Sequence, residues 1–433
     1  MVEKINSNNQ KNKSEYILIF LIIILSVFLN QQKPMFGFNL SISDFAAVLL
    51  IILFTYKEKI VIPKNILAFF ILLSVATLIT AFFISPYKFN YIPEPNEIFN
   101  SYIKLISSFL YFILGYNLFK NQDITIAYKW YSYGAVMIGF IGIIIVFFNV
   151  NIFSRDYFFE GPRYIGLMSD PNYYAVIMCT SLVYFLRKRN INKILKAICY
   201  VIIFLSVAIS GSKTGMIIFI TYTMVILFQA TISTKTKGQL IKNITILLLF
   251  VGSLPLLSNY FMKIIQGIET QHPIFKRVLV LFYDFGAAVS GDGSGRDRTW
   301  SSAIDIIKES PFGVGIGSYL NVRTSLHGGG GLAHNTYLQI ISEWGVPLSL
   351  ILFLFLLHLV IKHLILNNKY QVESVVVRDI LLILLIGSIS LSLNNARMFW
   401  FFIGALSCSN IGEKDLKSLR YATGESKKIY HTK

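Results

Sequence analysis

The stretch "YILIFLIIILSVFLN" (residues 16–30) indicates the class of fold. Its residues are almost all apolar, and Lys4, Lys11 and Lys13 precede it. Crossing a bilayer core of ~30 Å takes about 20 mainly apolar residues. The stretch has a basic flank but no small-residue cleavage site, so we expect it to stay in the chain as the first membrane span.

The rest of the chain repeats this pattern. Of its 433 residues, 55% are hydrophobic and 14% are charged, and the mean hydropathy is +0.61. An ordinary globular domain has about 25% charged residues, so a large soluble core is excluded. We predict an all-α polytopic membrane protein with about twelve transmembrane helices. These spans cover residues 16–30, 40–55, 65–84, 102–119, 131–150, 172–186, 194–210, 214–230, 241–259, 337–361, 379–393 and 396–409.

The net charge of +17 raises the question of nucleic-acid binding, but the placement of the charges argues against it. Lysine and arginine cluster at the termini and in short connections, as they do on the cytoplasmic side of membrane proteins. The basic segments are 56–64, 119–129, 187–193, 234–242, 362–378 and the tail after Gly412. The alternating segments, such as 85–100, are neutral or acidic. We therefore predict that both termini are cytoplasmic and that no nucleic acid is bound.

Four regions follow from this topology. Residues 1–259 form an N-terminal membrane bundle with spans one to nine, and residues 260–333 form an external loop with short amphipathic helices. Residues 334–409 contain spans ten to twelve, and residues 410–433 form a basic cytoplasmic tail. A loop this long is usually functional or disordered, so we expect any chemistry between the loop and the bundle.

The cysteines give no sign of a disulfide framework. Cys179, Cys199 and Cys408 all lie in spans or at their edges. We interpret them as small core residues.

The external loop contains one clear amphipathic pattern. Apolar residues recur at helical spacing at Trp300, Ala303, Ile304 and Ile307. Ser294 and Asp297 fit a capping box, and Pro311 marks the end of the helix. We expect this helix to lie along the membrane surface with Trp300 at the interface.

Arg296 and Arg298 fall in the first turn of that helix. Free backbone N–H groups, two guanidinium groups and flexible glycines together make a receptor for phosphate. The alternative is that both arginines contact only lipid headgroups. "GVGIGS" (313–318) lacks the lysine and the strand–helix context of a phosphate-binding loop, so we interpret it as a tight turn.

The segment "HGGGGLAHNTYLQIISEWG" (327–345) joins the loop to span ten. A helix that begins near residues 332–334 puts His334 on one face with Tyr337, Ile341 and Trp344. Asn335, Gln339 and Ser342 form a polar stripe beside that face. His334 can act as a base, although a histidine at a helix start is more often a cap or a headgroup contact. Glycines 328–331 are interpreted as a hinge or a close-approach segment, and His327 has no assigned role.

Two further stretches place cations on the same outer side. Arg163 follows a Gly-Pro pair, and Asp170-Pro171-Asn172 is predicted to cap span six. Lys213, in "SGSKTG" (210–215), lies at the outer end of span eight. Either cation could instead be a snorkelling anchor.

Together these residues favour one kind of chemistry. Arginines and a histidine, with no zinc-type cluster and no close pair of carboxylates in the outer loop, argue against a metal-dependent reaction. They suit a pyrophosphate leaving group held by cations, with a base that activates a hydroxyl. A lipid-linked sugar pyrophosphate is a natural substrate of this kind.

The same residues resemble a known family. "GRDRTWSSAIDIIKESPFGVGIGSYL" (295–320) and "AHNTYLQIISEWGVPLSLILFLF" (333–355) are similar to the hallmark region of the O-antigen ligase/polymerase superfamily. Its pattern is Gly-Arg, a Trp four residues after the Arg, Gly-x-Gly, then His-Asn and a Gly ten residues after the Asn. "RYIGLMSDPN" (163–172) and "SGSKTG" resemble two upstream outer-face motifs of the family.

The resemblance implies a bacterial polytopic glycosyltransferase that needs no metal and no cofactor. Its members transfer a glycan from undecaprenyl pyrophosphate to an acceptor hydroxyl at the outer face of the cytoplasmic membrane. Carried over, His334 deprotonates or orients the acceptor, and Arg296 and Arg163 hold the pyrophosphate. Lys213 stands where arginine is commoner and lacks its bidentate fork. Arg298 has no clear counterpart; it joins Asn335 and Tyr337 among the candidate substrate-binding residues.

Three functions stay open at this point. One is a polymerase of lipid-linked repeat units for O-antigen, capsule or exopolysaccharide. Another is a ligase that moves the finished glycan to lipid A core or another acceptor. Leu348 stands where the ligase pattern has a second glycine, which favours the polymerase. The last is a transporter or flippase of lipid-linked sugars, but the chain shows no internal repeat. Besides lipid-linked oligosaccharide and the bilayer, candidate partners are a chain-length regulator and a flippase.

Overall fold

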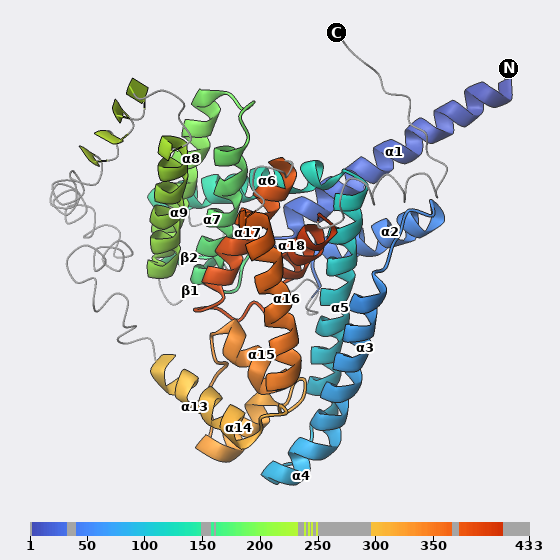
Figure 1. The fold of residues 1–433 in the computed structure, drawn as a ribbon, viewed down its shortest axis with the longest axis vertical. Coiled ribbons are helices and arrows are strands. Elements are labelled where there is room, and N and C mark those ends of the chain that lie inside the picture. The colour runs from blue at the N-terminus through green and yellow to red at the C-terminus, as the bar shows by residue number, and fades with distance from the viewer. Residues whose placement is uncertain are drawn as a thin grey trace.

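The computed structural model describes residues 2–32, 40–148, 157–159, 162–232, 296–365 and 372–409, with four residue pairs between 238 and 249; its side chains are described from Ser14 onward, apart from residue 232. Within these ranges the chain is almost entirely helical (Figure 1). Its elements are α1 (Val2–Phe28), α2 (Ile42–Tyr56), α3 (Lys64–Ile79), the π-helix η1 (Thr80–Ile84), α4 (Ser85–Phe89), α5 (Pro95–Lys120), α6 (Ile124–Phe147), β1 (Phe158–Phe159), β2 (Arg163–Tyr164), α7 (Pro171–Arg187), α8 (Lys193–Ser210), α9 (Lys213–Ile232), α13 (Arg296–Glu309), α14 (Tyr319–His327), α15 (Thr336–Trp344), α16 (Val346–Ile365), α17 (Val372–Gly387) and α18 (Arg397–Cys408). The two strands form one antiparallel pair.

The predicted all-α class is confirmed. Six described helices are long and apolar enough to cross a membrane: Lys64–Phe89, Pro95–Lys120, Ile124–Phe147, Lys193–Ser210, Lys213–Thr231 and Val346–Ile365. Shorter apolar helices cover Ser14–Phe28, Ile42–Tyr56 and Arg397–Cys408. The chain is therefore a multi-pass membrane protein. Most of the expected span 241–259 falls outside the described residues, and the total of about twelve spans stays a prediction.

Contacts between distant segments separate two ends of the bundle. At one end the basic connections meet: Lys57 Nζ donates to the Ser14 carbonyl (3.2 Å), and Lys188 pairs with Glu373 (3.0 Å). At the other end the segments expected outside meet, through Gln32 N to Leu167 O (3.0 Å), Ser85 Oγ to Val314 O (2.7 Å) and Thr336 N to Ser388 O (2.8 Å). The basic connections thus lie at one end of the bundle and the neutral or acidic ones at the other, which agrees with the topology predicted from charge.

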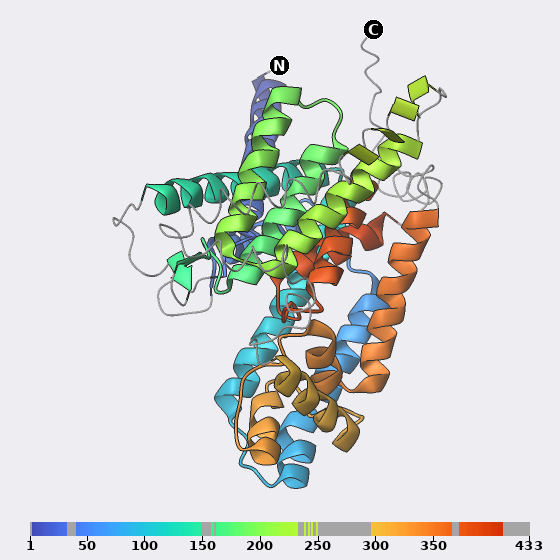
Figure 2. The ribbon, with the colours of Figure 1, turned by 90° about the vertical axis from the view of Figure 1, so that its left-hand side faces the viewer.

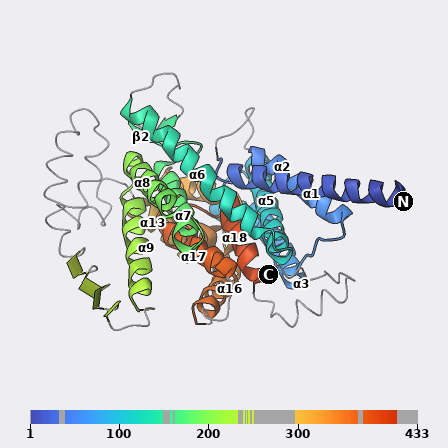
Figure 3. The ribbon, with the colours of Figure 1, turned by 90° about the horizontal axis from the view of Figure 1, so that it is seen from above.

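Helix α18 lies at the centre of the bundle, between α5 and α17 (Figure 3). All of its residues except Arg397 and Ser407 are buried, in keeping with a helix that is apolar on nearly every face. Helices α18 and α5 cross closely because each has a glycine at the crossing point. A Cβ on Gly115 would lie 1.9 Å from the Phe401 carbonyl oxygen, and one on Gly404 would lie 2.0 Å from that of Phe112. Small residues at such a crossing let two membrane helices pack backbone to backbone.

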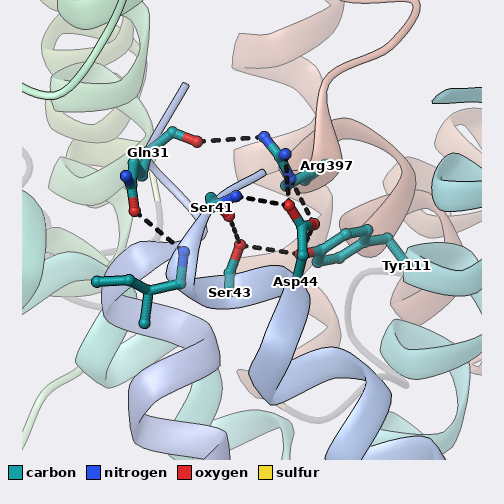
Figure 4. A network of polar contacts seen from close by, with 7 residues as sticks. Gln31, Ser41, Ser43, Asp44, Tyr111 and Arg397 are labelled. Atoms are coloured by element: carbon teal, nitrogen blue, oxygen red, sulfur yellow. Dashed lines mark hydrogen bonds and ion pairs between the residues drawn. The ribbon is translucent and has the colours of Figure 1, made fainter. Parts of the chain in front are cut away.

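An ion pair joins the first turns of α2 and α18 (Figure 4). Arg397 forms two parallel bonds to Asp44, Nε to Oδ1 (2.7 Å) and Nη2 to Oδ2 (2.6 Å). The Tyr111 hydroxyl from α5 donates to Asp44 Oδ1 (2.8 Å), and the Ser41 N–H donates to Oδ2 (2.7 Å). Three helices are thus tied together around one carboxylate.

Helices α4, α13, α14 and α15 form a subdomain at one end of the molecule, below α7, α8 and α9 (Figures 1 and 2). We call it the outer subdomain, because the charge pattern of the sequence predicts these segments on the outer side. It has an apolar cluster of its own, separate from the main core: Phe89, Ala303, Ile306, Val314, Tyr319, Val322 and Ala333. The predicted apolar stripe of α13 is partly wrong. Ile304 is 42% exposed, whereas Ile306 is fully buried. Helix α13 packs on α14 and α15, so its buried face is turned relative to the predicted membrane-facing one. Ser294, of the predicted capping box, lies outside the described residues; the helix ends at Glu309, before Pro311, as predicted.

The predicted continuous span 337–361 is also wrong. The chain forms two helices, α15 and α16, and Gly345 between them has φ +82°. A Cβ on Gly345 would lie 2.3 Å from the Phe312 carbonyl carbon, and the Val346 N–H donates to the Pro311 carbonyl (2.7 Å). The loop after α13 therefore wedges between the two helices. The predicted spans 379–393 and 396–409 likewise become α17, which ends at Gly387, and α18, which begins at Arg397.

A π-helix interrupts the long helix that runs from α3 to α4. Pro86 has no N–H and its ring would clash with the carbonyl four residues earlier, and the Ser85 N–H instead bonds the Thr80 carbonyl five residues back. Gly315 packs against this segment, where a Cβ would lie 2.3 Å from Ala81 N. Gly313, Gly315 and Gly317 all have positive φ, so "GVGIGS" is a tight turn, as predicted.

Candidate functional site

Arg163 is anchored between two helix ends. It lies in β2, and its residue is 8% exposed. Its Nε donates to the Ser210 carbonyl at the end of α8 (3.0 Å), and its Nη2 donates to Asn172 Oδ1 in the first turn of α7 (3.4 Å). The side chain lies against protein groups at the ends of two helices, which favours a built position over a snorkelling anchor.

The start of α7 has the predicted cap. Asp170 Oδ1 accepts from the N–H groups of Asn172 (2.7 Å) and Tyr173 (3.0 Å), and Pro171 occupies the first helical position. An acidic side chain here satisfies free N–H groups and complements the helix dipole. The cap also fixes Asn172, whose side chain contacts Arg163.

Lys213 is the first residue of α9, as predicted, and is half-buried. Gly211 before it has φ +62° and ends α8 in the left-handed conformation. Arg163 bonds the carbonyl of Ser210 on the other side of this turn. The turn therefore brings Lys213 into the same region as Arg163.

Arg296 begins α13 and is half-buried. Burial lowers the pKa of its guanidinium, and the charge of Asp170 opposes that effect. This electrostatic contact places the start of α13 near the start of α7, although more than 120 residues separate them in the chain. Arg298 is exposed, and among the described residues no contact joins it to Asp170 or Arg163.

His334 lies in a bend and not in a helix. The predicted helix start near 332–334 is wrong: α15 begins at Thr336, with Asn335 as its cap. His334 therefore does not share the helical face of Tyr337, Ile341 and Trp344. Its φ is +49°, a left-handed conformation that a side chain with a Cβ rarely adopts. The histidine is exposed, and its neighbours Ala333 and Asn335 are buried.

The neighbours of His334 hold this bend. The Ala333 N–H donates to Gln339 Oε1 (3.4 Å), and its carbonyl accepts from Thr299 Oγ1 (3.4 Å). The Thr336 hydroxyl donates a hydrogen bond to the Leu391 carbonyl (2.6 Å), in the segment after α17. Strained backbone of this kind persists only where its surroundings fix it, and it concentrates at functional sites. The Thr299 contact also places Ala333 beside the first turn of α13, which begins with Arg296.

Asn335 and Tyr337 both have structural partners. Asn335 Oδ1 accepts from Tyr337 N (3.0 Å) and Leu338 N (3.1 Å), which is the bonding of a helix cap. The Tyr337 hydroxyl donates to the Leu385 carbonyl (2.7 Å). Their predicted contacts with substrate stay predictions.

The glycine run packs against an arginine. Arg323 Nη1 donates to the Gly331 carbonyl, and a Cβ on Gly330 would lie 2.4 Å from its guanidinium carbon. The close-approach interpretation therefore fits at Gly330, and Gly328 ends α14 with φ +72°. His327 lies 3.9 Å from Asp305.

Most of the predicted cations thus come together. Arg163 bonds Asn172 at the start of α7 and Ser210 beside the Lys213 turn, and the charge of Asp170 at the start of α7 acts on Arg296. Helix α13 connects Arg296 to the His334 bend through Thr299. We call the set Arg163, Lys213 and Arg296 the outer cation site.

Residues 198–356 match the O-antigen ligase family. The match supports the O-antigen ligase/polymerase superfamily, whose members are glycosyltransferase-like enzymes. It covers Lys213, Arg296 and His334, whereas Arg163 lies before it. Searches of curated proteins and of solved structures found no match.

Several residues of this region were not anticipated. Asn172, Thr299 and Glu343 lie within the quoted motifs but were given no part in the site, because their roles depend on contacts across the fold. The Glu343 carboxylate lies in a largely apolar helix, and a charged residue in such a place is itself an indication of function. The three cysteines are buried and free, as predicted. Among the described residues, no three His, Cys, Asp or Glu side chains lie together.

Proposed function

We propose that this O-antigen ligase relative is a polymerase of lipid-linked oligosaccharide repeat units. It transfers a glycan from undecaprenyl pyrophosphate to a sugar hydroxyl at the outer face of the cytoplasmic membrane. The observation that carries the proposal is the outer cation site beside the His334 bend. Cations from three separate segments meet where the lipid-embedded bundle joins the outer subdomain.

The cations suit the leaving group. When the bond between the anomeric carbon and the pyrophosphate oxygen breaks, negative charge develops on that oxygen. Arg163, Lys213 and Arg296 offer fixed positive charge, and partial burial of Arg296 strengthens its field. No step of this scheme calls on a metal, in line with the expectation from the sequence.

His334 is suited to activate the acceptor hydroxyl. Its exposed ring can take the proton of the attacking hydroxyl as that oxygen bonds the anomeric carbon. The products are the lengthened glycan, undecaprenyl pyrophosphate and a protonated imidazole, which then releases its proton to water.

A ligase is the second candidate. The description of the matching family favours it, because that description is "O-Antigen ligase". Leu348, in place of the second glycine of the ligase pattern, favours the polymerase. Both use the same donor chemistry and differ in the acceptor.

The first test replaces His334 or Arg296 by alanine in the native host. We expect each variant to lose polymer by about a hundredfold or more, as for removal of a general base or of a charge that stabilises the transition state. The amount of protein in the membrane should be unchanged. Arg189→Ala, at an exposed position at the opposite end of the bundle, is the control and should leave polymer as in the wild type. Wild-type polymer in both test variants would contradict the proposal.

Deletion in the same host separates the candidates. Loss of a polymerase leaves single repeats attached to the usual acceptor. Loss of a ligase leaves long polymer on the lipid carrier, and loss of a flippase leaves repeats on the inner face of the membrane. Gel profiles of glycan length, together with the attached lipid, distinguish these outcomes.

A further inference from the structure

Helix α15 carries a buried carboxylate close to the His334 bend. Glu343 is 9% exposed, and Gln339, one turn before it, is 1% exposed. Glu343 has no part in the transfer scheme described above. Burying a charged side chain costs free energy unless the charge is paired or hydrogen-bonded.

Gln339 bridges Glu343 to the residue before His334. Its Nε2 donates to Glu343 Oε1 (2.7 Å), and its Oε1 accepts from the Ala333 N–H (3.4 Å). An ionised carboxylate only accepts hydrogen bonds, so the amide nitrogen must face it. The amide oxygen then faces Ala333. The carboxylate thus sets the orientation of Gln339, and Gln339 holds the Ala333 peptide.

We propose that Glu343 is a positioning residue for His334. As a carboxylate it orients the Gln339 amide, which holds the Leu332–Ala333 peptide directly before the left-handed bend at His334 and so presents the imidazole to the acceptor hydroxyl. This inference rests on the proposed role of His334 as the base. It assigns a function to a side chain that touches neither donor nor acceptor.

The surroundings of Glu343 make the arrangement sensitive to pH. Burial raises the pKa of Glu343 to about 7, against the opposing effects of the Gln339 hydrogen bond and the charge of Lys104 from α5. Tyr319 from α14 also faces it, with Arg323 near the same tyrosine. Once protonated, Glu343 can donate to Gln339 Oε1, and the amide can then turn over. Its NH₂ would face the Ala333 N–H, donor against donor.

The sign of the effect follows. The restraint on the bend is present above the pKa of Glu343 and is lost as the pH falls through about 7. Every other titrating group acts alike in the wild type and in a Glu343 variant, so the ratio of the two rates isolates the effect of Glu343. If protonation of Glu343 slows the reaction, a variant that cannot titrate at this position becomes faster relative to the wild type as the pH falls through about 7.

Glu343→Gln is the decisive variant. A glutamine keeps an oxygen that accepts from Gln339 but does not titrate. Polymer formation is measured in membrane vesicles from the native host, on their own lipid-linked glycan, between about pH 5.5 and about pH 8.5. We expect a rate within a few-fold of wild type at the alkaline end, and a ratio of variant to wild-type rate that rises roughly tenfold towards the acid end. A ratio that stays constant over this pH range would overturn the inference.

Glu343→Ala and a matched control complete the test. Removal of the acceptor should lower kcat roughly ten- to a hundredfold, with the KM for the donor unchanged, because orientation and not binding is lost. Glu309→Gln removes an exposed carboxylate from the same subdomain and should match the wild type in kcat and in its dependence on pH. A wild-type kcat in Glu343→Ala would count against the inference.

A readout that needs no substrate separates the two proposals. Diethylpyrocarbonate modifies exposed histidines, and mass spectrometry of the detergent-purified protein gives the rate at His334. Glu343→Ala should change that rate several-fold and Glu309→Gln should not; equal rates would overturn the inference. If His334→Ala makes normal polymer, the proposed function fails. If His334→Ala is inactive while the Glu343 variants match the wild type, only the positioning role fails.

Discussion

Substitutions at Asn335 can distinguish a structural role of this residue from a contact with substrate. Its side-chain oxygen accepts from two N–H groups at the start of α15. Serine caps helices about as well as asparagine, whereas alanine costs about 1 kcal/mol. We therefore expect Asn335→Ser to keep both thermal stability and polymer, and Asn335→Ala to lose some of each. Melting in detergent and polymer on gels provide the measurements.

The opposite result would be informative. A stable Asn335→Ser protein that makes no polymer would show that the amide acts on substrate, as the sequence pattern suggests, and that its capping bonds are secondary.

Single residues of the site were predictable to an unequal degree. Charge and motif spacing indicate Arg163, Lys213, Arg296 and His334 without any structure. The positive φ of His334 was not predictable, because bonds from Gln339 and Thr299, in two different helices, support it. Arg298 shows the converse: its position resembles that of Arg296, yet it lies exposed two residues farther along α13.

At the scale of helices, the crossing of α5 and α18 depends on two glycines. Gly404→Ala puts a methyl group 2.0 Å from the Phe112 carbonyl oxygen, which only a shift of the backbone can relieve. Such overpacking costs about 1–3 kcal/mol, and more where only the backbone can move. We expect a clear fall in the melting temperature in detergent.

Gly238→Ala is the matched control, because no atom lies within 4 Å of the Cβ it would add. An equal effect of both substitutions would show that the loss of glycine, and not the close crossing, determines stability.

Helix boundaries mark the limit of sequence reasoning at this scale. Hydropathy treats residues 337–361 as continuous because both α15 and α16 are apolar. The break at Gly345 results from the loop after α13 that packs there, a contact 32 residues away in the chain at Phe312 and Gly313. The buried face of α13 is likewise chosen by α14 and α15 and not by a membrane surface. Local periodicity cannot encode such partners.

At the scale of the whole molecule, the Arg397–Asp44 pair joins the first and last parts of the described bundle (Figure 4). The two side chains are 14% and 15% exposed. Removing one partner of a buried pair leaves a charge without compensation and costs about 3 kcal/mol. We expect Arg397→Ala and Asp44→Ala each to be strongly destabilised. The double variant should lose less stability than the two single losses added together.

A double-mutant cycle on melting temperatures in detergent measures this coupling. Additive losses would show that the two residues contribute separately. The pair itself was not foreseen, because 353 residues separate its members and neither belongs to a recognised motif.

The two apolar clusters share no residue. The outer one is built on α4, α13, α14 and the start of α15, and the inner one fills the bundle. A substitution at a residue of one cluster therefore changes no side chain of the other. Helix α15 still links the two, because Ile340 and Trp344 belong to the inner cluster and Leu338 packs against the outer one. This helix is thus a joint between two separately packed parts of one chain.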